Sequence, residues 1–275
     1  MKQNTISNAR GRSWAVRGTV AAFVVALAAG AWIGCKKLHA VWTGQCVLTD
    51  VSRQVSVTTG SNIRRELVLE KFGLTNGANL AKIDFAQKRR DLLAGVPNIR
   101  ALTVSRRLPD RVEIAVEERE PVARMNERNG KRVTGRVVDA DGVVFLRQDA
   151  GTALLPMLVE AQEPTKPGKR LEGRSRAALR FLLACQESAY SDLKPLAVST
   201  SFKDFLYATL GDYTRAKVAW DGMDSQGDAA ETALRVQLKA LCDARRSTPA
   251  GRQAVKIWNV TLPGLATGDT KEPIQ

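Results

Sequence analysis

Residues 97–123 read PNIRALTVSRRLPDRVEIAVEEREPVA, and this stretch decides the fold of the region around it. The run 99–106 is rich in β-forming residues and leads into Leu108-Pro109-Asp110, a turn where proline fixes φ and no backbone donor is needed. From residue 112 to 116, Val and Ile alternate with Glu and Ala, the period-two pattern of a half-buried strand. The stretch therefore predicts two strands joined by a tight turn.

The residues before this hairpin predict one strand and two helices. Val55 and Val57 alternate with polar residues and stop at a Thr-Gly-Ser-Asn turn, which indicates a strand. Helical spacing of apolar residues over 63–72 predicts a helix, and Asp84 is placed to cap a second helix. The order β-α-α-β-β, over about 70 residues with both helices on one face of the sheet, is the architecture of a POTRA domain.

The motifs in this unit resemble those of the bacterial cell-division family FtsQ/DivIB. That family has a Gly-x-Asn-Leu turn followed by Ile-Asp, a spaced pattern of Pro, Val, Ala, Val, Arg and Pro, and a Glu-Arg-x-Pro-x-Ala ending. This chain is similar throughout, except that Leu102 replaces the usual Ala. The matching motif residues are Gly77, Asn79, Leu80, Asp84, Pro97, Arg106, Pro109, Glu118, Arg119 and Pro121. Residues 138–145 resemble the next landmark of the family, an Asp-x-x-Gly hairpin.

The resemblance implies a POTRA domain over residues 50–120, followed by an FtsQ-type β-domain over residues 121–262. The motif residues suit turns and caps, so we interpret them as structural. The predicted elements of the β-domain are a hairpin around Asp141-Gly142, a helix from about residue 175 to 190, strands at 196–200, 204–210 and 214–220, a helix at 228–242 and a last strand at 254–262. The predicted fold class is α+β.

The last strand is the predicted partner-binding site. No strand signal is found in residues 263–275, which we expect to be a flexible tail, so the edge of the strand is open to a strand from another chain. The resemblance implies FtsB-like and FtsL-like partners here, although Trp258-Asn259-Val260 stands where the family has Asp-Leu-Arg. The predicted partner-binding residues are Lys256, Trp258, Val260, Thr261 and Leu262. Trp258 is either a partner anchor or a core residue.

Residues 18–35 form an uncharged, largely apolar run that nearly spans a hydrocarbon core of about 30 Å as a helix. Four Lys and Arg residues precede the run and two follow it, which predicts a cytoplasmic tail at 1–17, a linker at 36–49 and an exported remainder. A lipoprotein box ending at Cys35 is the alternative, and Trp32 departs from its pattern. The predicted location is the inner membrane, with most of the chain in the periplasm, and the resemblance implies the division septum.

The net charge of +14 does not predict a nucleic-acid-binding protein. Residues 1–37 contain six of the 42 Lys and Arg residues and no acid, which leaves 36 basic against 28 acidic residues, or +8, for the rest. Much of this excess lies in Lys88, Arg89, Arg90, Arg100, Arg106, Arg107 and Arg111. The cluster fits either a solvated basic face or a surface that faces anionic lipid or polymer.

No metal site, cofactor or catalytic group is predicted. The four cysteines have no CxxC spacing, and the one histidine is His39. Cys185 and Cys242 are either buried thiols or a disulfide. Ser191-x-x-Lys194 matches the motif of penicillin-recognising enzymes, but Pro195 follows at once and the partner motifs are missing, so we interpret it as a loop.

The sequence therefore predicts a non-enzymatic, single-pass membrane scaffold of the division machinery. The resemblance implies contacts with FtsB-like and FtsL-like proteins through the last strand, and with other division proteins through the POTRA and membrane segments. The alternative function is a POTRA-type chaperone for outer-membrane insertion or secretion, although no barrel of the usual kind fits after residue 120.

Overall fold

The computed structural model describes residues 32, 33, 36, 44–107, 109–127, 135–147, 149–161, 164–220, 223, 228–248 and 255–270. The predicted cytoplasmic tail, almost all of the predicted membrane helix and Cys35 lie outside these residues. Within the described ranges, no helix is both long enough and apolar enough to cross a membrane.

The chain divides into two compact units, and each is described by itself. The first unit holds the described residues up to 58, together with 65–89 and 103–115. The second unit holds 59–64, 90–102 and the described residues from 116 on. One end of the β-α-α-β-β region is therefore counted with the second unit, and the predicted domain boundaries stay predictions.

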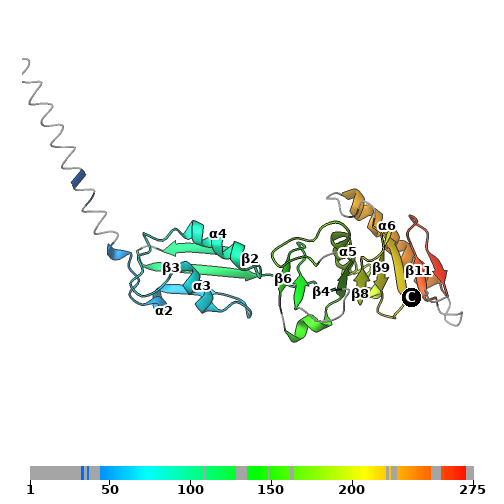
Figure 1. Cartoon of the computed structure of the whole chain (residues 1–275), viewed down its shortest axis with the longest axis horizontal. Coiled ribbons are helices and arrows are strands. Elements are labelled where there is room, and N and C mark those ends of the chain that lie inside the picture. The colour runs from blue at the N-terminus through cyan, green and yellow to red at the C-terminus, as the bar shows by residue number, and fades with distance from the viewer. Residues whose placement is uncertain are drawn as a thin grey trace, which may run out of the picture. The chain divides into compact units, whose positions relative to one another are not determined.

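The β-α-α-β-β region has the predicted order of elements (Figure 1). Its elements are α2 (Val51–Gln54), β1 (Val55–Thr58), α3 (Arg65–Phe72), α4 (Phe85–Gly95), β2 (Ile99–Arg107) and β3 (Arg111–Glu118). The sheet order is β1-β3-β2, with β1 parallel to β3. Gly73 closes α3 as predicted, with a φ of +70° that favours glycine. The short α2, which Asp50 caps, is the one element of this region that the sequence patterns did not predict.

A nine-stranded mixed sheet forms the core of the second unit, in the order β12-β11-β10-β9-β8-β7-β4-β5-β6. The strands are β4 (Ala123–Glu127), β5 (Arg136–Val138), β6 (Val144–Leu146), β7 (Met157–Glu160), β8 (Ala197–Ser199), β9 (Phe205–Thr209), β10 (Arg215–Ala219), β11 (Ile257–Asn259) and β12 (Thr267–Asp269). The helices are α5 (Gly173–Ala184), α6 (Asp228–Ser247) and the short 3-10 helices η1 (Ala150–Leu154) and η2 (Ser191–Leu193).

Helices α5 and α6 pack against one face of this sheet. Strands β7, β8, β9 and β10 alternate between buried and half-exposed residues, as expected when only one face is covered. The buried set joins the apolar faces of the two helices in one core, whose members include Leu158, Val198, Leu206, Ala216, Phe181, Leu182, Leu234, Leu238 and Trp258. The other set lies on the opposite face of the sheet.

Most predicted elements of the second unit are confirmed, and two expectations are wrong. The hairpin turns at Gly142, which has a φ of +81°, and both helices are present. The first of them ends at Ala184 rather than residue 190, because the backbone after it continues as i to i+3 turns. The strand at residues 254–262 is not the last: β12 follows it inside the predicted tail and pairs antiparallel with β11.

Candidate functional site

The first group of motif residues builds a turn and a helix cap in the β-α-α-β-β region. Gly77 has a φ of +86°, which an L side chain rarely adopts, and Leu80 is completely buried. The Asn79 side chain accepts a hydrogen bond from a backbone N–H two residues later. The Asp84 carboxylate accepts one from the N–H of Gln87 at 2.9 Å, which confirms the predicted cap of α4.

Two further motif residues hold the hairpin of strands β2 and β3. The Arg106 guanidinium lies 4.4 Å from the centroid of the Phe85 ring, at the start of α4, so β2 and α4 are joined by a cation–π contact. Pro109 lies in the turn between the strands, as predicted. Both residues stabilise the local fold.

Glu118 fixes the turn that precedes α3. Its carboxylate accepts hydrogen bonds from the backbone N–H groups of Asn62 and Ile63, at 3.1 and 2.9 Å. Glycine at position 60 leaves room for this carboxylate, because a Cβ there would lie 2.6 Å from the Glu118 carboxyl carbon and would displace it. The sequence patterns contained both residues but could not show that they meet.

Arg119 joins the POTRA ending to the Asp-x-x-Gly hairpin. Its Nη1 donates to the Asp139 carboxylate at 2.5 Å and its Nε donates to the Pro97 carbonyl at 3.0 Å. The second Asp139 oxygen accepts the Val143 N–H at 2.7 Å, which closes the hairpin. The side chains of Arg119 and Asp139 are only 15% and 5% exposed. Two motifs that are separate in the sequence thus form one buried ion pair inside the second unit.

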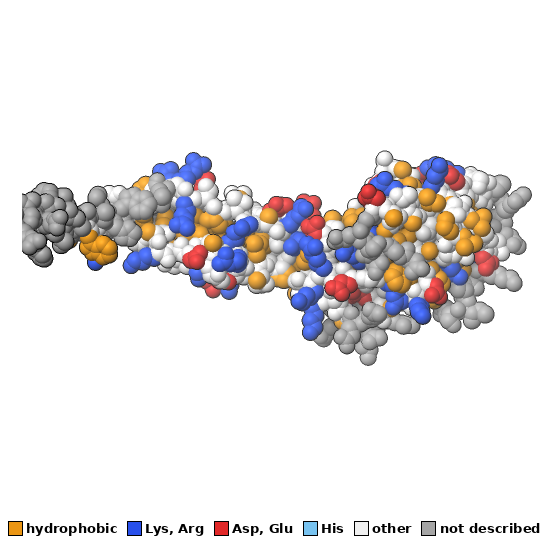
Figure 2. Space-filling model, turned by 90° about the horizontal axis from the view of Figure 1, so that it is seen from above, with side chains coloured by type: hydrophobic (Ala, Val, Ile, Leu, Met, Phe, Trp, Pro, Cys, Tyr) orange, Lys and Arg blue, Asp and Glu red, His pale blue; other side chains and the backbone are white. Residues whose placement is uncertain are grey.

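The clustered basic residues of the β-α-α-β-β region are exposed. All seven lie at the surface, and the ion pairs among them include Arg100 with Glu117 and Arg107 with Glu113. On the face shown in Figure 2, Lys and Arg side chains alternate with apolar side chains rather than gathering in one continuous patch. The arrangement fits a solvated basic face.

The predicted partner-binding residues divide into exposed and buried ones. Lys256 and Leu262 are exposed, and Thr261 is half-buried. Trp258 and Val260 are buried, with 6% and 0% exposure, and both belong to the core of the second unit. The Val260 N–H donates to a carbonyl of β10, so it is not available to a partner strand. These facts place Trp258 among core residues, although one side of it lines a pocket.

Strand β12 covers the edge that the sequence patterns left open. The contact is close, because a Cβ at Gly268 would lie 2.9 Å from both methyl carbons of Val255 and 3.4 Å from the Trp258 ring. All three β12 residues are exposed, and β12 ends the strand order of the sheet. The missed signal was the turn at Pro263-Gly264, where Gly264 has a φ of +71°. The loop before β12 also exposes Leu262 and Leu265, by 61% and 50%.

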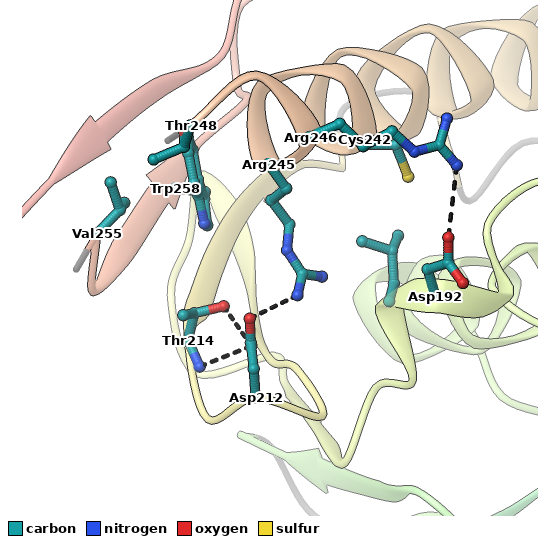
Figure 3. Close-up of a pocket in the computed structure, with 10 residues that line it drawn as sticks. Asp192, Asp212, Thr214, Cys242, Arg245, Arg246, Thr248, Val255 and Trp258 are labelled. Atoms are coloured by element: carbon teal, nitrogen blue, oxygen red, sulfur yellow. Dashed lines mark hydrogen bonds and ion pairs between the residues drawn. The ribbon is translucent and has the colours of Figure 1, made fainter. Parts of the chain in front are cut away.

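A pocket of about 370 Å³ lies beside these strands (Figure 3). Its lining residues come from η2, the turn between β9 and β10, the end of α6 with the residue after it, and β11 with the residues just before it: Asp192, Leu193, Asp212, Thr214, Cys242, Arg245, Arg246, Thr248, Val255 and Trp258. Arg245 and Arg246 each point to one carboxylate, that of Asp212 and that of Asp192. The charges in the pocket are therefore balanced in pairs, which does not favour a free anion as ligand.

Ionisable groups around the pocket serve the fold. Burial raises the pKa of Asp212, but hydrogen bonds from Thr214 and the charge of Arg245 outweigh this effect and hold the pKa below its ordinary value. Burial raises the pKa of the Cys242 thiol, with Arg246 and Arg245 opposing the shift. A thiol with a raised pKa is a poor nucleophile at neutral pH. Cys242 is therefore suited to packing.

No catalytic arrangement is found among the described residues. They contain no group of three His, Cys, Asp or Glu side chains that could hold a metal ion. Ser191 begins the short η2, and its hydroxyl donates to the Ser188 carbonyl at 3.1 Å. Lys194 ends η2 with a φ of +42°. Cys46, Cys185 and Cys242 are buried thiols that form no disulfide with one another.

These features define the class of the protein: an α+β protein with a POTRA domain and an adjoining mixed-sheet domain. Residues 52–119 match the family model of the POTRA domain of the FtsQ type. The chain is 27% identical over 196 residues to "Cell division protein FtsQ" of Streptomyces bingchenggensis (strain BCW-1), and the match covers 70% of each chain. These matches confirm the resemblance found in the sequence: the chain is similar to cell-division proteins of the FtsQ/DivIB family.

Proposed function

We propose that this chain is a non-enzymatic scaffold of the cell-division machinery, which recruits and regulates other division proteins by protein contacts during septum formation. The observation that carries the proposal is the FtsQ-type POTRA domain at residues 52–119. The motif residues of that domain have structural roles, so the function depends on surfaces rather than on a catalytic group. The name of the Streptomyces relative supports the cell-division role.

The scaffold is a single-pass protein of the inner membrane, with residues 1–17 in the cytoplasm and the bulk in the periplasm at the septum. The support is the uncharged run 18–35 and the excess of Lys and Arg before it. A reporter that requires export, fused after Gln275, should be active, and a cytoplasm-only reporter at the same position should be inactive. The reverse pattern would overturn the orientation.

Partners of the FtsB and FtsL kind bind at the edge of the sheet, and the edge strand is β12 rather than β11. A partner strand would gain main-chain hydrogen bonds along β12. The exposed Leu262 and Leu265 lie in the loop before β12 and would add apolar contacts. The pocket lies next to this edge, because Val255 and Trp258 both line it and contact Gly268.

The test is a pair of exposed leucine substitutions with a matched control. Leu262→Glu with Leu265→Glu should weaken capture of FtsB-like and FtsL-like partners by about 10-fold or more. The double variant loses apolar contacts with the partner, while the packing of the core is unchanged. Leu154→Glu is the control, since Leu154 is 90% exposed on η1 of the same unit. Wild-type capture by the double variant, or equal loss in the control, would show that the binding edge lies elsewhere.

A further inference from the structure

The sheet face opposite α5 and α6 carries a cluster of aromatic side chains. Phe202 and Phe205 are stacked, with ring centroids 4.7 Å apart, and Phe202 meets the Tyr207 ring edge-on at 5.4 Å. Phe205 and Tyr207 are on the half-exposed side of β9, while Leu206 between them points into the core. Phe202 is 43% exposed. Large rings at a protein surface in contact with one another are typical of interaction sites.

Two cations of β10 accompany these rings. The Lys217 ammonium lies 5.2 Å from the Phe205 centroid, and the Arg215 guanidinium lies 5.8 Å from the Tyr207 centroid. Arg215 also donates a long hydrogen bond, 3.5 Å, to the Tyr207 hydroxyl. In the described part of the chain, neither cation forms an ion pair with a carboxylate. Their charges are therefore available to a ligand.

A third cation lies in the same row of the sheet. Residues that pair directly across strands point to the same face, and the paired row runs from Arg124 through Met157, Ala197 and Thr209 to Arg215. Four strand spacings separate its ends, which is about 19 Å. The Arg124 Nε is buried and has no hydrogen-bond partner within the described residues. The row therefore has a cation at each end and small or apolar side chains between them.

The chemistry of this surface defines its ligand. We call it the aromatic–cationic face, made of Phe202, Phe205, Tyr207, Arg215, Lys217 and Arg124. Apolar rings next to unpaired cations require a partner with both apolar side chains and carboxylates. Lys217 and Arg215 lie over the Phe205 and Tyr207 rings, so the exposed part of Phe202, which is stacked on Phe205, is the main apolar surface left for a partner.

We propose that the aromatic–cationic face binds an acidic amphipathic segment of a partner protein, at a site separate from β12. The carboxylates of the segment would pair with Arg215, Lys217 and Arg124, and its apolar side chains would pack on Phe202 and its neighbours. The proposal does not depend on the edge contact, since it uses β4, β9 and β10 rather than β12. The scaffold would then hold two partner segments at once.

The test uses the full-length protein in nanodiscs of zwitterionic lipid and two fluorescent peptides of 18 residues. One peptide carries Glu on one helical face with Leu and Phe on the other, and the second carries Lys at each Glu position. Fluorescence anisotropy should show binding of the Glu peptide to the wild type. Arg215→Glu with Lys217→Glu should weaken this binding at least ~10-fold and should create binding of the Lys peptide.

Two controls make the result specific. Lys166→Glu with Lys239→Glu changes the charge equally at exposed positions of the same unit and should leave binding of the Glu peptide unchanged. Phe202→Ser should weaken binding without altering the circular dichroism spectrum, because the ring is outside the core. No binding to the wild type, equal losses in both charge variants, or displacement of the peptide by a peptidoglycan disaccharide-peptide would overturn the proposal.

Discussion

The β-α-α-β-β region and the C-terminal strands use their side chains in different ways. In the first, the motif side chains of Asp84, Glu118 and Arg119 bond to the backbone or to a buried carboxylate of the same chain. In the second, Leu262 and Leu265 are exposed beside an edge strand. Residues that identify the family thus stabilise its fold, whereas the proposed binding surface lies in residues without a motif. Each prediction below tests one side of this difference.

The largest expected effect is at the ion pair that joins two motifs. Asp139→Ala should lower the free energy of unfolding by about 4 kcal/mol, because it removes the buried carboxylate of the pair and leaves the largely buried Arg119 guanidinium only the more distant Asp141, at 3.9 Å. Glu113→Ala is the matched control at an exposed pair with Arg107, and it should cost less than about 1 kcal/mol. Urea denaturation of the full-length protein measures both. Equal losses of stability in the two variants would contradict the distinction between motif residues and surface residues.

The second-largest effect is expected at Trp258, which the sequence predicted to be either a partner anchor or a core residue. Trp258→Ala should lower the free energy of unfolding by about 3 kcal/mol, because the buried ring contacts β12 through Gly268 and lines the pocket. Thermal denaturation followed by circular dichroism is the measurement. A variant of unchanged stability that still loses partner binding would make Trp258 an anchor and contradict its assignment to the core.

A smaller effect is expected at Gly268. Gly268→Val should cost about 2 kcal/mol, because its Cβ would overlap the methyl groups of Val255 and push β12 away from β11. Amide hydrogen exchange should show faster exchange in β11 and β12 only. Loss of protection throughout the second unit would mean that β12 is part of the core rather than a covering strand.

The sequence patterns predicted elements with local signals and missed those that depend on distant pairing. The order β-α-α-β-β, the cap at Asp84 and the hairpin at Gly142 follow from spacing and turn residues, and all are present. Strand β12 is Thr-Gly-Asp, which has little β propensity and forms only because β11 lies beside it. The same holds for β4, which pairs in parallel with the later strand β7.

The same limit applies to the candidate functional site. The patterns located the C-terminal strand as a candidate but could not show that Trp258 and Val260 face the core, since burial is decided by packing with α6. They also could not bring Arg119 to Asp139, or Gly60 to Glu118, because no periodicity relates residues that meet only after folding. The motif residues could be identified from the sequence, but the contacts that they form could not.

The smallest expected effect is the pH dependence of the buried thiols. Burial, with a contribution from Cys242, raises the pKa of Cys185 from 9.0 to about 12. This group therefore stabilises the fold fully below pH 9 and loses that contribution as the pH rises toward 12. The stability difference between wild type and Cys185→Ala should shrink over this range. Both thiols should react with iodoacetamide at pH 8 only after denaturation, and rapid alkylation of the folded protein would contradict their burial.

The central claim is that division partners add a strand to β12. Hydrogen exchange of the full-length protein, with and without the proposed FtsB-like and FtsL-like partners, measures this most directly, because a new strand must protect amides of the edge it joins. The account predicts strong new protection in residues 262–270 and little change in the β-α-α-β-β region. Tight binding with unchanged exchange in residues 262–270 would contradict it.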